Sequence, residues 1–265
     1  MRFVAFLLLL PFIAGAQAFP KQQLTAAQDS IVARYATRGA ERFSYLSPQW
    51  QQQLNEGLAQ DSTIGDLWQM KAMPLFKTRK YEAGLRYLDK AVRYDSSWLD
   101  YRGFIRCIFA KQYSAALEDL NHCKTRMPGG YVMDHPYDLY RALCYLQLNE
   151  FDKALALLEA VTSDDAAHDR SHHLRLLYLG VAQMETGAYA KAIAAFDLAI
   201  ARFPQFSDAY FYKGKCLGLL GRTSEGLAEM RKGKTYFEKG YSINEDNSVY
   251  ELYPYQVAWR WKSVR

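Results

Sequence analysis

The chain has 265 residues, of which 50% are apolar, 15% are aromatic and 23% are charged, and its formal net charge is +5. This composition is too apolar for a disordered chain, and the length is enough for a full hydrophobic core. The basic residues are scattered along the chain, whereas duplex nucleic acid needs them aligned on one surface. We therefore expect one folded unit or one continuous array, with no nucleic-acid partner.

Residues 1–18 have the pattern of a secretory signal peptide. Arg2 precedes an apolar run over 3–14, and the triplet at 16–18 is a small-x-small cleavage site. The run is shorter than the ~20 residues that a membrane-spanning helix needs, and no later stretch is long enough. We expect cleavage after Ala18, export to the periplasm and no transmembrane segment in the mature chain.

Two helices are expected next, ahead of any repeat. The first begins near Thr25, which together with Gln28 fits a capping box. The second begins at Ser47 and Pro48, which are typical of an N-cap and a first helical turn.

Segments of the form aromatic-x-x-small recur along the chain and predict a helical repeat. They open at Tyr81, Tyr113, Phe151 and Tyr189, and Thr223 opens a more degenerate fifth copy. Their separations of 32, 38, 38 and 34 residues indicate a 34-residue period with one short deletion and two four-residue insertions. Both insertions fall between repeats, where a longer loop costs little closure entropy. They are found at 131–134 and near 168–171.

The clearest copy is "HLRLLYLGVAQMETGAYAKAIAAFDLAIARFP", in which small residues at Gly180 and Ala192 let two antiparallel helices approach closely. Phe196 would fill the groove between these helices. This spacing resembles the tetratricopeptide repeat, and the resemblance covers roughly residues 47–238. It implies an all-α, right-handed superhelical solenoid of about five helix pairs.

Several blocks also resemble a narrower group, the exported tetratricopeptide proteins of Bacteroidota. Among them are "LWQMKAMPLFKTRKYEAGL", "VMDH" and "GYSINEDNSVYELYPYQ". This resemblance implies export and a repeat fold, and it implies no particular chemistry. The expected organisation is a signal peptide at 1–18, N-terminal helices at 19–64, repeats near 65–96, 97–130, 135–168, 173–206 and 207–240, and an aromatic tail at 241–265.

The first helices of such an array line a concave groove, where we expect a noncatalytic scaffold to bind a protein or peptide partner. Tyr140, Tyr178 and Tyr212 occupy the same position in three consecutive copies. Two alternatives stay open: the apolar members pack helix against helix, or the tyrosine rings bind a small ligand or a glycan. The expected groove residues are Met73, Phe76, Tyr101, Arg102, Ile105, Phe109, Tyr140, Tyr178, Phe211 and Tyr212.

We expect no enzyme and no cofactor, because the sequence contains neither a G-x-S-x-G nor a zincin motif. His168, His172 and His173 form the only local cluster with metal-ligand chemistry. They lie in a polar connection between repeats, so a solvated linker is the favoured interpretation. A metal-dependent role of this cluster is the alternative.

The four cysteines lack the paired C-x-x-C spacing of a zinc site. Cys123 and Cys144 are expected to face each other across the interface between the second and third copies. Two outcomes are open for them, a disulfide across that interface or two free thiols. Cys107 and Cys216 are expected to be small buried residues inside helices.

The chain ends in an aromatic stretch, "YELYPYQVAWRW", at 250–261. The last repeat of a solenoid needs a cover for its outward apolar face, and Pro254 disfavours a capping helix here. We predict that 250–261 folds back as a mostly irregular segment over copy five, with Tyr250, Tyr253 and Tyr255 on its helices.

Copy five has glycine at all three of its small positions, Gly214, Gly226 and Gly233. Glycine has a low helix propensity, so this repeat should be less stable than the others and should need a cover more. The competing interpretation is a free docking peptide that binds a partner through its rings and basic residues. The basic residues concerned are Arg260, Lys262 and Arg265.

Overall fold

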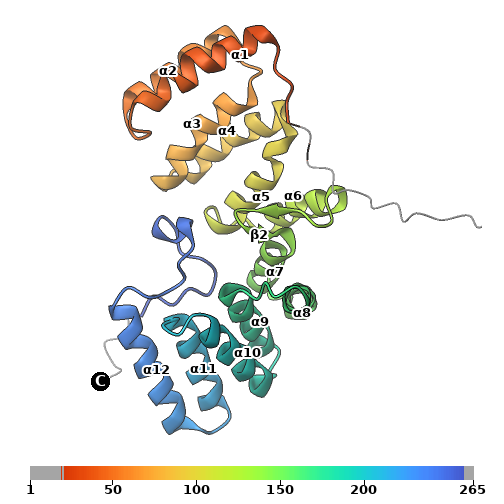
Figure 1. Ribbon diagram of the computed structural model, residues 1–265, viewed down its shortest axis with the longest axis vertical. Helices are drawn as coiled ribbons and strands as arrows, with labels where there is room; N and C mark the ends of the chain where they lie inside the picture. The colour runs from red at the N-terminus through yellow and green to blue at the C-terminus, as the bar shows by residue number, and fades with distance from the viewer. Residues whose placement is uncertain (1–18, 20, 260–265) are drawn as a thin grey trace, which may run out of the picture.

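The computed structural model describes Phe19 and residues 21–259, which form a curved stack of helices (Figure 1). The predicted signal peptide and the basic residues Arg260, Lys262 and Arg265 lie outside the described residues, as does Trp261. Within the described ranges, no helix is long and apolar enough to cross a membrane.

The N-terminal part packs as a small unit with its own core around Leu54, Ile64 and Leu67. Both predicted helix starts are confirmed: Thr25 forms a capping box with Gln28, and the Ser47 hydroxyl accepts a hydrogen bond from a main-chain N–H. The elements are α1 (Ala26–Val32), its π-helical continuation η1 (Ala33–Thr37), the 3-10 turn η2 (Ala40–Arg42) and α2 (Pro48–Gln60).

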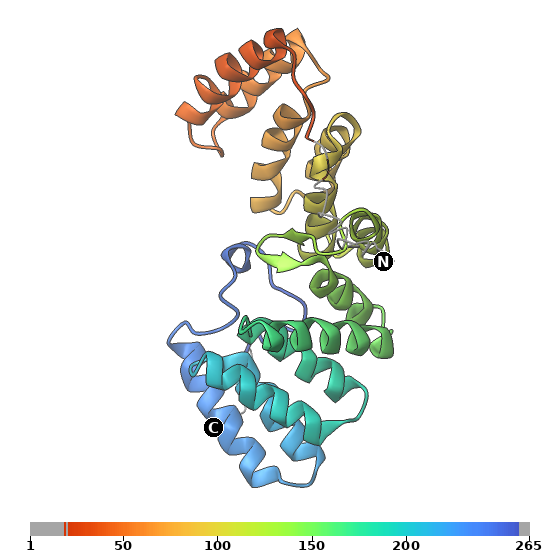
Figure 2. The same cartoon turned by 45° about the vertical axis from the view of Figure 1, so that its right-hand side comes forward.

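Five antiparallel helix pairs follow and stack along the long axis of the molecule (Figures 1 and 2). Their second helices begin at the aromatic residues of the repeat pattern or, in the fifth pair, at a threonine. The pairs are α3 (Gly65–Lys77) with α4 (Tyr81–Tyr94), α5 (Leu99–Ile108) with α6 (Tyr113–Arg126), α7 (Tyr137–Gln147) with α8 (Phe151–Ala167), α9 (His173–Glu185) with α10 (Tyr189–Arg202), and α11 (Ser207–Leu219) with α12 (Thr223–Glu238); η3 (Ser96–Trp98) precedes α5.

The first insertion forms a hairpin and the second mainly lengthens a helix. The hairpin consists of β1 (Tyr131–Val132) and β2 (His135–Pro136), with left-handed backbone at Met133 (φ 46°) and Asp134 (φ 64°) between the strands. α8 has 17 residues, whereas α4, α6 and α10 have 14 each. The hairpin lies beside the start of α9, where the His135 and His172 rings are 5.1 Å apart.

Close approach of the two helices depends on glycine in several pairs. A Cβ on Gly180 in α9 would lie 2.4 Å from the ring of Phe196, which is fully buried in α10. In copy five, a Cβ on either Gly214 or Gly226 would lie 2.5 Å from the other residue's carbonyl oxygen. The glycines that weaken this repeat by propensity therefore let α11 and α12 pack backbone against backbone.

We expect Gly180→Ala to lower the stability of the protein by about 1–2 kcal/mol, because overpacking against Phe196 outweighs the gain in helix propensity. The matched control is Gly218→Ala in α11, where an added Cβ meets nothing within 4 Å. That change should raise stability by up to about 1 kcal/mol. Thermal denaturation of both variants measures the difference, and equal effects would contradict the packing argument.

Candidate functional site

The groove of the array is occupied by the chain's own C-terminal segment, residues 241–259. After α12 the chain reverses at Gly240 (φ 88°), and the segment contains only one short 3-10 turn, η4 (Asp246–Val249). Figures 1 and 2 show it leaving the end of α12, crossing the inner side of the curved array and reaching the level of α5 and the hairpin. It contacts the first helices α7, α9 and α11 on its way.

Two of the three aligned tyrosines bind the main chain of this segment. The Tyr178 hydroxyl donates to the carbonyl oxygen of Pro254 at 2.8 Å, and the Tyr212 hydroxyl donates to that of Tyr255 at 2.7 Å. Tyr178 is fully buried and Tyr212 is 7% exposed. Because a buried hydroxyl without a partner is costly, both tyrosines depend on the segment for hydrogen bonding.

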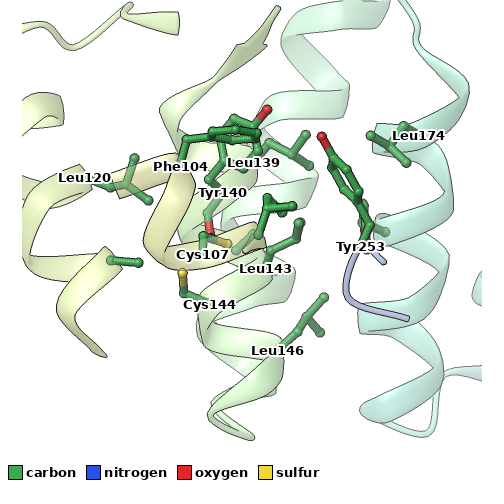
Figure 3. Packing of buried hydrophobic residues seen from close by; sticks show 14 of the residues in the cluster. Phe104, Cys107, Leu120, Leu139, Tyr140, Leu143, Cys144, Leu146, Leu174 and Tyr253 are labelled. Carbon is green, nitrogen blue, oxygen red and sulfur yellow. The ribbon is translucent and has the colours of Figure 1, made fainter. Parts of the chain in front are cut away.

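The third tyrosine of the series, Tyr140, turns its hydroxyl toward the hairpin and donates to the Met133 carbonyl oxygen at 3.3 Å. Its ring packs in the same buried cluster as Tyr253 of the C-terminal segment. Figure 3 shows the Tyr253 side chain between α7, which carries Tyr140, and α9, which carries Leu174. Tyr253 is 4% exposed, so its side chain is buried in the array.

A buried carboxylate holds both ends of the C-terminal segment. Asp208, in the first turn of α11, accepts hydrogen bonds at Oδ2 from the Ser242 hydroxyl (2.9 Å) and the Ile243 N–H (3.2 Å). Its Oδ1 accepts from the Val257 N–H at 2.8 Å. Burial raises the pKa of the Asp208 carboxyl, while these hydrogen bonds and the α11 N-terminus favour the charged form.

The middle of the segment, at 250–252, reaches the first and second repeats. The Tyr81 hydroxyl, at the start of α4, donates to the Glu251 carboxylate, and the Lys111 ammonium donates to the Leu252 carbonyl oxygen. The Lys77 ammonium lies 4.9 Å from the centre of the Tyr250 ring.

The predicted fold-back and irregular conformation of the tail are observed, but its position differs from the prediction. Tyr255 does pack near Tyr212, and Trp259 packs on Phe211 with ring centres 5.2 Å apart, so copy five is contacted. Tyr253 and Tyr250 instead lie on earlier repeats. The segment follows the groove because its hydrogen-bonding partners lie there. The buried tyrosine hydroxyls donate to its carbonyl oxygens, and the Asp208 carboxylate accepts from its N–H groups.

Several predicted groove residues pack between helices instead. Phe76, Ile105 and Phe109 are at most 2% exposed and belong to the main core. Tyr101 lies between the Trp98 and Phe104 rings, and Met73 packs on the N-terminal core. For these residues the helix-packing interpretation describes the placement.

Arg102 also lies away from the C-terminal segment. Its guanidinium makes a two-pronged contact with Asp119, at 2.9 and 2.7 Å, and reaches Asp89 at 2.9 Å. The residue at the tyrosine position of copy two therefore joins α4, α5 and α6 by ion pairs.

The cysteines are buried free thiols. Figure 3 shows Cys144 beside Cys107, and all four thiols are free, so Cys123 and Cys144 form no disulfide in this structure. Burial raises the pKa of Cys144 well above its ordinary value and that of Cys123 to about 12. Thiols in this state are poor nucleophiles at neutral pH.

The histidines expected to cluster divide into two groups. His168 is exposed at the end of α8 and contacts Asp164, whereas the His172 ring lies 5.1 Å from that of His135 in the hairpin. The His135 Nε2 is 3.0 Å from an oxygen of Glu245 in the C-terminal segment. His173 Nε2 is 2.9 Å from the Asn244 side-chain oxygen.

Sequence reasoning missed His135 and Glu245, because they are 110 residues apart and only the folded segment brings them together. The group borders a cavity of about 300 Å³. Burial, followed by the neighbouring His173 and His135, lowers the pKa of His172 to about 4. His172 is therefore neutral at neutral pH.

Comparison with known proteins agrees with this architecture. Residues 141–205 and 177–234 match the family model for the tetratricopeptide repeat. The fold is a tetratricopeptide-repeat solenoid. No curated protein matches the sequence significantly.

Solved structures with the tetratricopeptide fold resemble the chain at low sequence identity. A tetratricopeptide repeat protein from Parabacteroides merdae gives a TM-score of 0.64 at 14% identity, over 80% of each chain. MamA from Desulfovibrio magneticus RS-1 gives 0.56 at 17% identity, over 66% of this chain and 96% of that one. YrrB, described as having an unusual peptide-binding site, gives 0.50 at 15%, over 69% and 91%. At these identities the likeness shows the fold alone.

We expect Asp208→Asn to loosen the C-terminal segment. An amide has one acceptor oxygen, so its NH₂ group would face an N–H or hydroxyl of the segment, and hydrogen bonds to a charged group contribute about 1.5–3 kcal/mol. Hydrogen exchange at the Ile243 and Val257 amides should become faster. Asp246→Asn, at an exposed position of the same segment, is the control. Unchanged exchange at both amides would show that Asp208 does not hold the segment.

Proposed function

We propose that this protein is an exported, noncatalytic scaffold that binds an extended segment of a partner protein in its groove. The C-terminal segment occupies the same groove until a partner displaces it. The observation that carries this proposal is the pair of hydrogen bonds from Tyr178 and Tyr212 to main-chain carbonyl oxygens of the C-terminal segment.

The groove recognises features that every extended peptide has. A hydroxyl that donates to a carbonyl oxygen is indifferent to the peptide's side chains, whereas the pocket that holds Tyr253 selects a large aromatic residue. A glycan would stack on the flat faces of aromatic rings, whereas Tyr178 and Tyr212 contact the main chain of the segment through their hydroxyl groups. The arrangement therefore favours a peptide with an aromatic residue over a sugar.

The fold supports an interaction scaffold in general terms, because tetratricopeptide solenoids present extended inner surfaces to their partners. The noncatalytic role rests on the inert surroundings of the candidate groups: the described cysteines are buried thiols, and the tyrosine hydroxyls are engaged as hydrogen-bond donors. Export rests on the signal-peptide pattern of residues 1–18.

The C-terminal segment, which is tethered to the array, sets the minimum affinity that a partner needs in order to bind in the groove. A segment joined to its site by a short linker has an effective concentration of about millimolar, so a free partner must bind more tightly than the segment to replace it. Weak or unrelated peptides are thereby excluded, and the aromatic inner surface stays covered when no partner is present.

A synthetic peptide of residues 248–259 should bind in trans to a chain that ends at Gly240. We expect saturable binding by calorimetry to this truncated chain and none to the full chain, whose groove is filled. Replacing Tyr178 and Tyr212 by Phe should weaken binding about fivefold for each lost hydroxyl, since one neutral hydrogen bond contributes about 1 kcal/mol.

Tyr210→Phe is the matched control, because its hydroxyl donates to the Pro204 carbonyl outside the groove. Circular dichroism checks that the truncated chain is folded. In the full chain, Tyr178→Phe with Tyr212→Phe should speed hydrogen exchange over 253–257, which tests the same contacts without truncation. Peptide binding that ignores both substitutions would contradict a groove site.

Export has a separate test. The mature protein should be recovered from the periplasmic fraction of its host, and N-terminal sequencing should begin at Phe19. Recovery of the uncleaved chain from the cytoplasm alone would contradict export while leaving the groove intact.

A further inference from the structure

We propose that His135, His172 and Glu245 bind a divalent metal ion, with zinc the best match to the ligands, and that the ion attaches the C-terminal segment to the array. Two of the ligands belong to the repeats and the third belongs to the segment. The proposal rests on contacts of the C-terminal segment and not on the identity of any partner.

The three side chains already converge. One potential ligand atom from each lies within 4.8 Å of the other two, and the His135 Nε2 and a Glu245 oxygen are 3.0 Å apart. Zinc bonds of about 2.0–2.1 Å place tetrahedral ligand atoms ~3.3 Å from each other. Small side-chain rotations would therefore close the three groups around one ion.

His135 provides a second and independent observation. It is 2% exposed, and its Nδ1 has no hydrogen-bond partner within the described part of the chain. A buried imidazole nitrogen without a partner is costly, so native proteins rarely keep one without a reason. An ion bound at Nδ1 would supply the missing partner of this nitrogen, while Nε2–H continues to donate to the Glu245 carboxylate.

The surroundings suit a cation. The cavity of about 300 Å³ is also bordered by the carboxylates of Asp134 and Asp246, and it has room for water to complete the coordination. The Asn244 side-chain oxygen lies 2.9 Å from His173 Nε2 and orients that ring beside the site. His172 Nδ1 accepts from the Leu174 N–H at 3.3 Å, so ligation through Nε2 requires the ring proton to move to Nδ1 and this hydrogen bond to break. Two imidazoles with one carboxylate favour zinc over magnesium or calcium, which prefer oxygen ligands alone.

The site accounts for one irregularity of the repeat. The first four-residue insertion forms the hairpin that carries His135, and His172 is the N-cap of α9. The hairpin brings the His135 ring to 5.1 Å from the His172 ring. Glu245 joins them only when the C-terminal segment lies in the groove, so an ion bound here requires the occupied groove.

Calorimetric titration of zinc into the full chain, freed of metal and carrying no histidine tag, tests the site. We expect one zinc per chain with a dissociation constant on the order of micromolar or tighter. Glu245→Gln and His172→Asn should each weaken binding at least tenfold. Asparagine at 172 can still accept the Leu174 N–H as an N-cap, so α9 keeps its start.

His168→Asn is the matched control, because His168 is 59% exposed and contacts Asp164 rather than the proposed ligands. Zinc at a hundredfold excess over its dissociation constant should raise the melting temperature of the full chain by about 5 °C and slow hydrogen exchange over 241–246. The Glu245→Gln chain should melt like the unchanged protein without metal and gain nothing from zinc. Absence of saturable zinc binding, or binding lost in His168→Asn but kept in the other two variants, would overturn the proposal.

Discussion

The buried carboxylate of Asp208 is the interaction on which the position of the C-terminal segment depends. It lies on α11, the first helix of the fifth pair. It accepts hydrogen bonds from both ends of the segment, at Ile243 and at Val257. The intervening residues must therefore leave α11 and return to it. The length of that loop carries Tyr253 across to α7 and α9, and brings Glu251 to Tyr81.

The repeats are irregular in the places where this loop needs to be received. The third copy has an inserted hairpin before α7 and a longer second helix, α8, of 17 residues. The hairpin and the start of α9 border the cavity that the segment closes with Asn244 and Glu245. In the fifth copy, α11 and α12 pack backbone against backbone at their glycines. This contact positions α11, which carries Asp208. The departures from the ideal repeat thus lie where the array contacts the C-terminal segment.

The sequence predicts the solenoid well, because its signals are local. The helix starts at Thr25 and Ser47 follow from capping chemistry, and the tetratricopeptide pattern follows from small residues that face large ones, as at Gly180 and Phe196. Each of these features depends on residues within one or two helices. The stacking of copies then follows from the repetition itself.

The candidate site was only partly predictable, because its contacts join residues far apart in the chain. The aligned tyrosines Tyr178 and Tyr212 mark the inner surface correctly, since their register follows from the period. Nothing local distinguishes Arg102, whose partners Asp119 and Asp89 draw it between helices. The pairing of His135 with Glu245 depends on the path of an irregular segment, which has no periodicity to reveal it.

The contacts of the C-terminal segment are separate and individually modest, and this bears on how the groove could open. Single neutral hydrogen bonds such as those to Tyr178 and Tyr212 contribute about 1 kcal/mol, and those to a charged group such as Asp208 contribute about 1.5–3 kcal/mol. A partner segment could replace the tyrosine contacts one by one while Asp208 still holds the two ends of the loop. Displacement would then proceed from the middle of the segment, where Tyr253 is the large side chain to be removed.

A metal ion bound by both the repeats and Glu245 would oppose that step, because it attaches the same loop next to Tyr253. Occupancy of the groove and occupancy of the histidine cluster are therefore coupled through one short stretch of chain.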